Sequence, residues 1–366
     1  MRFSISREAL LKPLQIVSGV VEKRQTLPIL SNVLMNVSSD RLTLTGTDLE
    51  VELTASTMLE NATEGEVTLP ARKFMDICRA LPDESILDLS LDGEKVTIRS
   101  RKSRFTLATL PATDFPSTDA IKGAYEFDIA QNVLKQLIER TQFCMANQDV
   151  RYYLNGLLLE IDSNTLRTVA TDGHRLAMCE MQQTLPSTEK RQVIIPRKGV
   201  NELARMLLDS DDTCNIKINA NHVKIELSDI VFTSKLIDGR FPDYDRVVPQ
   251  GGDKIITARR NELRQALVRT SILSNEKYRG IRLNFSNNTL KATVHNPEQE
   301  EAVEEIDIDY MGDELEIGFN VSYLVDALNA VLQDDVVITL TDANSSCLIN
   351  GIDDESAKYV VMPMRL

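Results

Sequence analysis

Short runs of alternating apolar and polar residues recur along the chain, and some lead directly into segments with helical spacing. Residues 3–5 alternate in this way and are followed by Leu10, Leu11 and Leu14, which share one helical face. Alternation with a period of two is typical of a strand with one buried face, and apolar residues three and four positions apart indicate an amphipathic helix. The pattern therefore predicts a strand followed at once by a helix.

This strand-and-helix pattern occurs three times at a nearly constant spacing. Residues 127–129 repeat residues 3–5 with an offset of 124, and residues 256–258 begin a third copy. The Thr-Asp pair at 47–48 returns at the same offset at 171–172. Chance similarity among unrelated strands and helices is the alternative, but correlated features at one offset favour a threefold internal repeat.

Each copy contains a second strand and helix, which begin with residues 67–70, 193–196 and 317–320. Further short alternating runs are separated by polar turns, a pattern typical of antiparallel sheet. Proline, glycine, serine and aspartate cluster near residues 116–125 and 248–254, where we place the boundaries. The sequence therefore predicts an α+β protein with three tandem copies of a two-helix, antiparallel-sheet domain, at residues 1–120, 121–250 and 251–366.

The composition favours a cytoplasmic globular protein that needs no metal or cofactor. Of the 366 residues 42% are hydrophobic, enough to form a buried core, but no stretch is apolar for long enough to span a membrane. Glu8, Lys12 and Pro13 interrupt the apolar run that a secretory signal would need. The five cysteines are scattered and form no Cys-x-x-Cys pair, which argues against a disulfide framework and a zinc site.

The net charge of −14 is unevenly distributed, because the predicted helices are basic and the remainder is acidic. Lysine and arginine gathered on one class of element are typical of a protein that binds DNA phosphates without reading sequence. Solvated helix faces, common in any globular protein, would give a similar imbalance. The windows 7–18, 72–80, 131–141, 197–207, 259–271 and 321–332 together carry +8, which leaves −22 for the rest.

The first and third copies also carry opposite charge on one strand each. Arg99, Arg101, Lys102 and Arg104 flank a predicted strand in the first copy. A row of acids in the third copy would discourage unwanted pairing of strand edges. The alternative is that the basic edge of one chain meets the acidic edge of a second chain, in a head-to-tail contact that can close into a ring. The acids are Glu298, Glu300, Glu301, Glu304, Glu305, Asp307 and Asp309.

If the basic helices lined a hole, helix packing would set the number of chains in such a ring. Six helices at about 10 Å spacing leave an opening of roughly 9 Å, narrower than the major groove of DNA at about 12 Å. Twelve helices from two chains leave roughly 28 Å, which admits a duplex. A ring around DNA therefore requires at least two chains.

Five long strings of residues are far more specific than a short motif. They are Leu-Thr-Gly-Thr-Asp-Leu-Glu at 44–50, Gln-Asp-Val-Arg-Tyr-Tyr-Leu-Asn-Gly at 148–156, Ala-Thr-Asp-Gly-His-Arg-Leu at 170–176, Asp-Gly-Arg-Phe-Pro-Asp-Tyr at 238–244, and residues 359–366. With these strings the chain resembles, from end to end, the bacterial sliding clamps, the beta subunits of DNA polymerase III. The resemblance implies a DNA polymerase processivity factor, built as a closed head-to-tail homodimer of six domains that encircles and slides on duplex DNA.

The same resemblance implies a set of protein partners. An ATP-driven clamp loader, with its delta subunit as the partner, would open the ring, and a hydrophobic peptide-binding groove would tether the alpha subunit of polymerase III. Translesion polymerases, mismatch-repair proteins and ligase would also bind there. The protein would be a non-catalytic accessory subunit, located in the cytoplasm at the nucleoid.

For DNA, the resemblance implies flexible cations and polar side chains that neutralise phosphates without reading bases. The adjacent Tyr152 and Tyr153 would either stack on single-stranded template or pack against the protein. The implied DNA-binding residues are Arg24, Arg72, Lys73, Gln148, Tyr152, Tyr153, Arg197, Lys198, Arg205, Arg246, Asn320 and Tyr323.

For partner peptides and for the dimer, the resemblance implies two further residue sets. Apolar residues with adaptable methionines suit a groove that accepts varied peptides, although core packing is the simpler interpretation of the methionine and valine residues. The groove set is Leu154, Thr171, Gly173, His174, Arg175, Leu176, Pro242, Arg246, Val247, Val360, Met362, Pro363 and Met364. The dimer set is Lys73, Lys102, Arg104 and Phe105 on one chain, with Ile272, Leu273, Glu298, Glu300, Glu301 and Glu304 on the other.

Two other classes of function are weighed against the clamp. A hydrolase could use Asp172 and His174, with or without a metal ion, but His222 and His295 do not have the spacing of further ligands. The sequence has no HExxH, P-loop, GxSxG or GxGxxG motif. A monomeric single-strand-binding module would leave the opposite charges of the two edge segments unexplained. The sequence therefore favours a DNA-bound scaffold over an enzyme.

Overall fold

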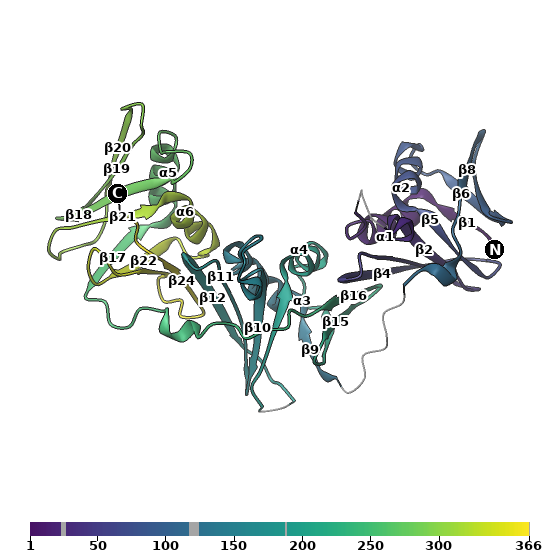
Figure 1. Ribbon diagram of the computed structural model, residues 1–366, viewed down its shortest axis with the longest axis horizontal. Helices are drawn as coiled ribbons and strands as arrows, with labels where there is room; N and C mark the ends of the chain where they lie inside the picture. Colours follow the sequence, from purple (N-terminus) through teal and green to yellow (C-terminus); the bar gives the residue numbers. More distant parts are fainter. Residues whose placement is uncertain (23–26, 117–123, 187–188, 366) are drawn as a thin grey trace. The chain divides into compact units, whose positions relative to one another are not determined.

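The computed structural model describes residues 1–22, 27–116, 124–186 and 189–365 (Figure 1). Within these ranges a strand, a helix and three further strands follow one another six times. Each predicted domain contains two of these five-element groups, so the repeat is finer than the threefold pattern of the sequence. Of the predicted domain boundaries, position 120 lies outside the described residues and position 250 lies between β16 and β17; both boundaries stay predictions.

The elements have the following bounds. The first repeat contains β1 (Arg2–Ser6), α1 (Arg7–Val17), β2 (Asn32–Val37), β3 (Arg41–Thr47), β4 (Val51–Met58), β5 (Gly65–Pro70), α2 (Ala71–Ala80), β6 (Ile86–Asp92), β7 (Lys95–Ser100) and β8 (Ser103–Ala108). The second contains β9 (Tyr125–Ala130), α3 (Gln131–Glu139), β10 (Gly156–Asp162), β11 (Thr165–Thr171), β12 (Arg175–Gln182), β13 (Arg191–Pro196), α4 (Arg197–Met206), β14 (Thr213–Ile218), β15 (His222–Leu227) and β16 (Ile230–Lys235). The third contains β17 (Lys254–Arg259), α5 (Arg260–Ser271), β18 (Gly280–Ser286), β19 (Thr289–His295), β20 (Glu301–Asp307), β21 (Leu315–Asn320), α6 (Val321–Ala330), β22 (Asp335–Leu340), β23 (Cys347–Gly351) and β24 (Ala357–Val361).

All six predicted helices are present within two residues of their expected ends. In α1, Leu10, Leu14 and Val17 have no exposed surface, and Ser6 accepts a hydrogen bond from the backbone N–H of Ala9 at 3.3 Å. A serine at this position satisfies one of the backbone donors that the first turn leaves unpaired. The apolar spacing thus gives the buried face of the helix, and the polar cap fixes where it begins.

The chain forms two compact units, which are described separately. The first comprises Met1–Asn132 and Asn201–Leu236. It contains an eight-stranded antiparallel sheet in the order β5-β2-β3-β4-β16-β15-β14-β9 and a four-stranded sheet in the order β1-β6-β7-β8. The larger sheet joins strands of the first and second repeats through the pair β4 and β16, in which Leu53 lies opposite Phe232.

The second unit comprises Val133–Val200 and Ile237–Leu366. Its eight-stranded sheet has the order β13-β10-β11-β12-β24-β23-β22-β17, and its four-stranded sheet has the order β20-β19-β18-β21. Here β12 and β24 join the second and third repeats, with Ala177 opposite Tyr359. The two units therefore use equivalent strand pairs to connect neighbouring repeats.

The repeated Thr-Asp pair forms the turn between two strands in each of the first two repeats. In the second repeat Asp172 Oδ1 accepts hydrogen bonds from the backbone N–H groups of His174 and Arg175, and the hydroxyl of Thr171 donates to the carbonyl of Arg175. Asp48 accepts in the same way from the residues two and three positions further along. Aspartate and threonine side chains commonly stabilise such turns. The repeated pair therefore has a structural role.

Candidate functional site

Two strands from different repeats bring the central residues of the predicted groove together. Leu176 on β12 lies opposite Val360 on β24. Beyond this pair, the backbone N–H of Met362 donates to the carbonyl of His174 at 2.9 Å. Residues that are almost 190 positions apart in sequence thus lie side by side.

Leu176 and Val360 belong to a buried apolar cluster beneath this junction. Both have 1% exposed surface, as does Leu154, so these three side chains are core residues in the single chain, and their part in peptide binding stays a prediction. Accessible apolar surface comes instead from half-buried Val247 and from Met362, which is 38% exposed. The rest of the cluster is Leu158, Val169, Met178, Ile194, Phe241, Tyr244 and Val248, flanked by Tyr153, Ile237 and Leu348.

The segment that carries Pro242, Arg246 and Val247 is held by a carboxylate that the sequence-based prediction missed. Glu160 is fully buried in the middle of β10, where it accepts hydrogen bonds from the Tyr244 hydroxyl at 2.8 Å and from Arg167 at 2.6 Å. An acidic residue within the apolar run of residues 157–161 was the available signal, because a buried charge needs partners.

Several donors share the Glu160 carboxylate. Gln192 donates to its Oε2, and the Lys190 ammonium lies 3.0 Å from the same atom. Burial alone would raise the pKa of Glu160, but the hydrogen bonds from Gln192, Tyr244 and Lys190 outweigh it and hold the pKa below its ordinary value. The carboxylate is therefore kept ionised, and it fixes the position of Tyr244.

The side chain of Arg175, one of the predicted groove residues, is held in place by several contacts within the chain. Its guanidinium donates to Asp172 at 3.0 Å, to Asp326 of α6 at 2.6 Å and to the carbonyl of Phe143 at 2.9 Å. The ring of Tyr323 lies 4.4 Å from the guanidinium carbon. Because its donors are occupied within the chain, Arg175 holds β12 against α6.

Other predicted groove residues lie around this junction. Thr171 is buried, and Gly173 has a φ of 88°, with the Arg151 guanidinium 2.8 Å from where a Cβ would stand. His174 and Pro242 are exposed, whereas Pro363 and Met364 are half-buried. The backbone N–H of Met364 donates to Gly318 of β21 at 2.8 Å. The peptide-binding role of the whole set stays a prediction.

The equivalent position between the first and second repeats has a different chemical character. Glu52 and Thr233 lie opposite each other at the position that Leu176 and Val360 hold in the second junction. The backbone N–H of Lys235 donates to the carbonyl of Glu50 at 2.8 Å, which is the counterpart of the bond from Met362 to His174. A carboxylate and an ammonium retain water and cannot form an apolar surface. Among the described residues, the strand pair of the first junction therefore does not repeat the apolar pair of the second.

The residues predicted to bind DNA vary in exposure. Arg72 and Lys73 on α2 are exposed, as are Gln148 and Arg205, and Lys198 is half-buried. Three of the arginines already have partners in the chain: Arg197 donates to the carbonyl of Met145, Arg205 pairs with Glu202 at 2.8 Å and Arg246 pairs with Asp243 at 2.8 Å. Arg24 lies outside the described residues.

The two adjacent tyrosines differ. Tyr152 is 56% exposed, whereas Tyr153 packs against the apolar cluster. The centroids of the two tyrosine rings are 5.7 Å apart, and the planes of the rings meet at 70°. Tyr153 thus packs against the protein in the single chain, and stacking on single-stranded template stays a prediction for both tyrosines. Asn320 and Tyr323 lie beside the groove residues, Asn320 as the N-terminal cap of α6 and Tyr323 against Arg175.

Apart from Lys73 on α2, the residues predicted at the dimer contact lie on or beside the edge strands β8 and β20 or follow the end of α5. Arg104 and Phe105 are on β8, preceded by Lys102, and Phe105 is half-buried while the two cations are exposed. On the other side, Ile272 at the end of α5 is 75% exposed, and Leu273 is half-buried. Glu304 of β20 pairs with Arg269 of α5 at 2.6 Å, whereas Glu298, Glu300 and Glu301 are exposed.

The proposed hydrolase residues are engaged in the turn. Both carboxylate oxygens of Asp172 accept hydrogen bonds, from the backbone of His174 and Arg175 and from the Arg175 side chain. In the part of the chain that the structure describes, no group of three or more histidine, cysteine, aspartate or glutamate residues could hold a metal ion. The described helices include none that is long and apolar enough to cross a membrane.

Comparisons with known proteins identify the fold and then the family. Residues 1–119, 128–243 and 245–365 match the N-terminal, central and C-terminal domains of the DNA polymerase III beta subunit, so the chain has the three-domain architecture of a DNA clamp. The chain is 56% identical to the beta sliding clamp of Pseudomonas aeruginosa and 54% identical to that of Escherichia coli, in both cases over 100% of each chain.

Solved structures agree with this comparison. A crystal structure of the DNA polymerase III subunit beta from Pseudomonas aeruginosa superimposes with a TM-score of 0.97 at 55% identity, and a clamp from Caulobacter crescentus with 0.93 at 37%, each covering 100% of both chains. The chain belongs to the beta sliding clamps, the processivity subunits of DNA polymerase III. It is a non-catalytic subunit with DNA and polymerase as partners, and the hydrolase alternative is wrong.

Proposed function

We propose that two copies of this chain join head to tail into a closed ring around duplex DNA. The observation that carries the proposal is the use of equivalent strands at the internal junctions. Each group of a strand, a helix and three further strands ends in one of the strands β4, β8, β12, β16, β20 and β24. Four of these last strands pair with each other, β4 with β16 and β12 with β24. Strands β8 and β20 remain at the edges of the two four-stranded sheets. Pairing β20 of one chain with β8 of the next continues the series.

The internal junctions also suggest a register for this contact. Phe232 faces Leu53 in the first junction, and Tyr359 faces Ala177 in the second. Both aromatic residues are buried, with 0% and 1% exposed surface. The junctions thus place one aromatic residue of the incoming strand over an apolar residue of its neighbour.

Following the strand registers through each repeat gives the corresponding residues of β8 and β20. Phe105 takes the position of Phe232 and Tyr359. Ala302 takes the position of Leu53 and Ala177. Phe105 is only half-buried in the single chain, as expected for an aromatic residue whose covering partner belongs to a second copy.

Charge on the two edges favours the same contact. In this register Arg104 lies opposite Val303, with Glu301 and Glu305 as the acids on either side of it. Lys102 lies opposite Glu305. Opposite charges across an interface fix orientation and speed association more than they add affinity, while Phe105, Ile272 and Leu273 would supply the apolar contact.

The groove residues support a role in recruiting proteins to the ring. Exposed Met362 and half-buried Val247 above a packed apolar cluster suit a short peptide with hydrophobic side chains. We assign to this surface the alpha subunit of polymerase III, the delta subunit of the clamp loader, translesion polymerases, mismatch-repair proteins and ligase as competing partners. The basic residues of the helices would contact DNA phosphates, which supports a location in the cytoplasm at the nucleoid.

The topology of DNA binding tests this proposal. Protein loaded by a clamp loader should leave linear DNA by sliding from its ends and should stay on a closed circle. Replacement of Ile272 and Leu273 by alanine should shift the sedimenting species from dimer to monomer at nanomolar concentration and abolish retention on the circle. Equal retention on linear and circular DNA would mean ordinary electrostatic binding, and an intact dimer of the double variant would refute the interface.

A further inference from the structure

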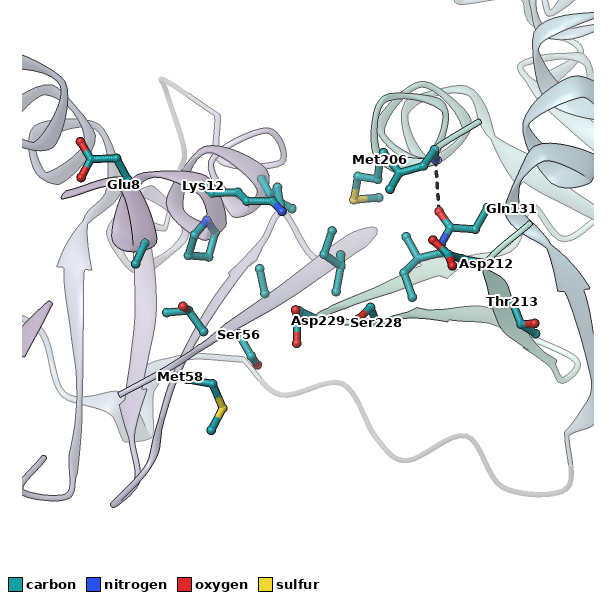
Figure 2. Close-up of a pocket in the computed structure, with 18 residues that line it drawn as sticks. Glu8, Lys12, Ser56, Met58, Gln131, Met206, Asp212, Thr213, Ser228 and Asp229 are labelled. Atoms are coloured by element: carbon teal, nitrogen blue, oxygen red, sulfur yellow. Dashed lines mark hydrogen bonds between the residues drawn. The ribbon is translucent and has the colours of Figure 1, made fainter. Parts of the chain in front are cut away.

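The first compact unit contains a pocket that the clamp function does not use. It has a volume of about 850 Å³, within the range of small-molecule and side-chain binding sites. Its walls come from α1, the end of β4, the turn between β15 and β16, and the segment around α4 and β14. Figure 2 shows Glu8 and Lys12 on one side, Gln131 and Asp212 on the opposite side, and Ser228 and Asp229 between them.

In the second unit an arginine of the chain itself fills the equivalent place. The guanidinium of Arg140 donates to Asp354 at 2.5 Å, to Ser356 at 2.9 Å and to the hydroxyl of Tyr359 at 3.4 Å. Asp354 and Ser356 belong to the turn between β23 and β24. This buried ion pair therefore connects the end of α3 to the turn beside the junction strands.

The two places occupy equivalent positions in the repeat, although the turn between β15 and β16 is shorter than the turn between β23 and β24. Ile16 precedes Arg140 by the repeat offset of 124. The backbone N–H of Ser56 donates to the carbonyl of Asp229 at 2.9 Å, as that of Glu180 does to the carbonyl of Ser356 at 2.8 Å. The first unit thus has the Asp229 carboxylate at the position of Ser356, which accepts from Arg140, and it has Ile16 in place of the arginine. By the same register Leu227 takes the position of Asp354, so Asp229 is the one carboxylate of this turn.

The pocket also contains a backbone acceptor without its usual partner. Pro13 lies inside α1 and has no N–H, so it cannot donate the helical hydrogen bond to the carbonyl of Ala9. Ala9 and Pro13 both line the pocket. The Asp229 carboxylate and the Ser228 hydroxyl are acceptors of two further residues that line the pocket.

Charge and apolar surface indicate the ligand. The charged residues that line the pocket are three acids, Glu8, Asp212 and Asp229, and one cation, Lys12. Glu8 is already paired with Arg7 at 3.2 Å, which leaves Asp212 and Asp229 as the main acids of the pocket. Apolar surface is supplied by exposed methionine and leucine at the pocket, which can pack along the stem of a long side chain. These residues are Met58, 63% exposed, and Leu208, 58% exposed.

We propose that this pocket binds an arginine side chain of another protein, flanked in that protein by apolar residues. The guanidinium occupies the place that Arg140 holds in the second unit and donates to the Asp229 carboxylate and to the turn. Its planar set of five donors matches carboxylate and carbonyl acceptors better than a lysine ammonium does. The pocket is lined by none of the residues assigned to the peptide groove, so the two sites are separate.

Binding of a labelled tripeptide tests this assignment on the full chain. The probe is Leu-Arg-Leu with blocked ends and a fluorescein label, compared by anisotropy with the citrulline analogue, which is neutral but has the same shape. We expect the arginine probe to bind at least about tenfold more tightly. Asp229→Asn, an exposed position that leaves folding intact, should remove most of this difference, and Lys12→Ala should increase the affinity. Asp92→Asn, on β6, is the matched control and should change nothing.

Ile16→Arg provides the second variant. Its side chain reproduces Arg140 from within the chain and should exclude the probe, while binding of a polymerase alpha-subunit peptide at the groove should stay unchanged. Equal affinity for the citrulline analogue, full binding to the Asp229→Asn and Ile16→Arg variants, or no saturable binding of the arginine probe would each overturn the proposal.

Discussion

The hydroxyl of Tyr244 donates a 2.8 Å hydrogen bond to Glu160, a carboxylate with no exposed side-chain surface. This contact joins the segment after β16 to the centre of β10. Pro242, Arg246 and Val247 lie within three residues of Tyr244, so the position of this edge of the proposed groove depends on a buried, hydrogen-bonded pair.

Tyr244→Phe should weaken peptide binding without opening the ring. A hydrogen bond to a charged group contributes about 1.5–3 kcal/mol, and its loss frees the segment that carries Val247. We expect the affinity for a labelled peptide of the polymerase alpha subunit to fall about threefold to tenfold by fluorescence anisotropy. Tyr310→Phe is the matched control, because the hydroxyl of Tyr310 also donates a hydrogen bond, to the carbonyl of Asp313. Unchanged affinity in Tyr244→Phe would show that Glu160 has no part in positioning the groove.

The register proposed for the dimer contact predicts which cysteine pair will crosslink. Residues directly opposite each other on antiparallel strands have Cβ atoms about 4.5–5.5 Å apart, close to the separation in a disulfide. Phe105→Cys combined with Ala302→Cys should therefore give a covalent dimer under mild oxidation, visible on a non-reducing gel. The five native cysteines are buried and should not interfere.

Phe105→Cys combined with Val303→Cys is the control for this register. A shift of one residue moves the side chain to the other face of the sheet, so this pair should crosslink poorly. Crosslinking of the control pair in preference to the first would place the two strands in a different register from the internal junctions.

Acid should remove the contribution of the Arg140 and Asp354 pair to stability. Burial would raise the pKa of Asp354, but hydrogen bonds from Ser356 and Arg140 outweigh it and leave the pKa below the ordinary value. The stabilisation is therefore present above the unfolded pKa of about 3.9 and is lost as the pH falls through the lower folded pKa.

Asp354→Ala should cost about 3 kcal/mol at pH 7, because it leaves a buried guanidinium without its partner. The melting temperatures of the variant and of the unmodified chain should approach each other as the pH is lowered from 7 toward 3. Asp83→Ala is the control, since Asp83 pairs with Arg7 at an exposed position. A difference in melting temperature that stays constant down to pH 3 would contradict the assignment.

Removal of a helix cation should lower the affinity for DNA by the same factor for every DNA sequence. A cation that neutralises one phosphate contributes about 0.9 to the slope of log affinity against log salt, so its removal should make the slope shallower by that amount. We expect this change for Arg72→Gln, measured by anisotropy on a short duplex of any sequence. Arg41→Gln, exposed on β3, is the control. If both variants gave the same slope as the unmodified chain, α2 would not face DNA.

The sequence by itself determined the local elements and the repeat. The spacing of Leu10 and Leu14 predicts α1 because helical periodicity is a property of neighbouring residues. The Thr-Asp turns at 47–48 and 171–172 are local for the same reason, since each side chain bonds to the backbone two to four residues away. Charge on the β8 and β20 segments is also visible in the sequence, because no pairing need be known to count it.

Only the tertiary structure decided which edges meet and which buried groups hold them. The pairing of Leu176 with Val360 and the contact of Glu160 with Tyr244 join residues more than 80 positions apart. Periodicity says that a strand has an apolar face, but every strand edge offers the same backbone donors and acceptors. The choice among edges depends on how whole surfaces of neighbouring repeats fit together, and for that reason it was settled only by packing.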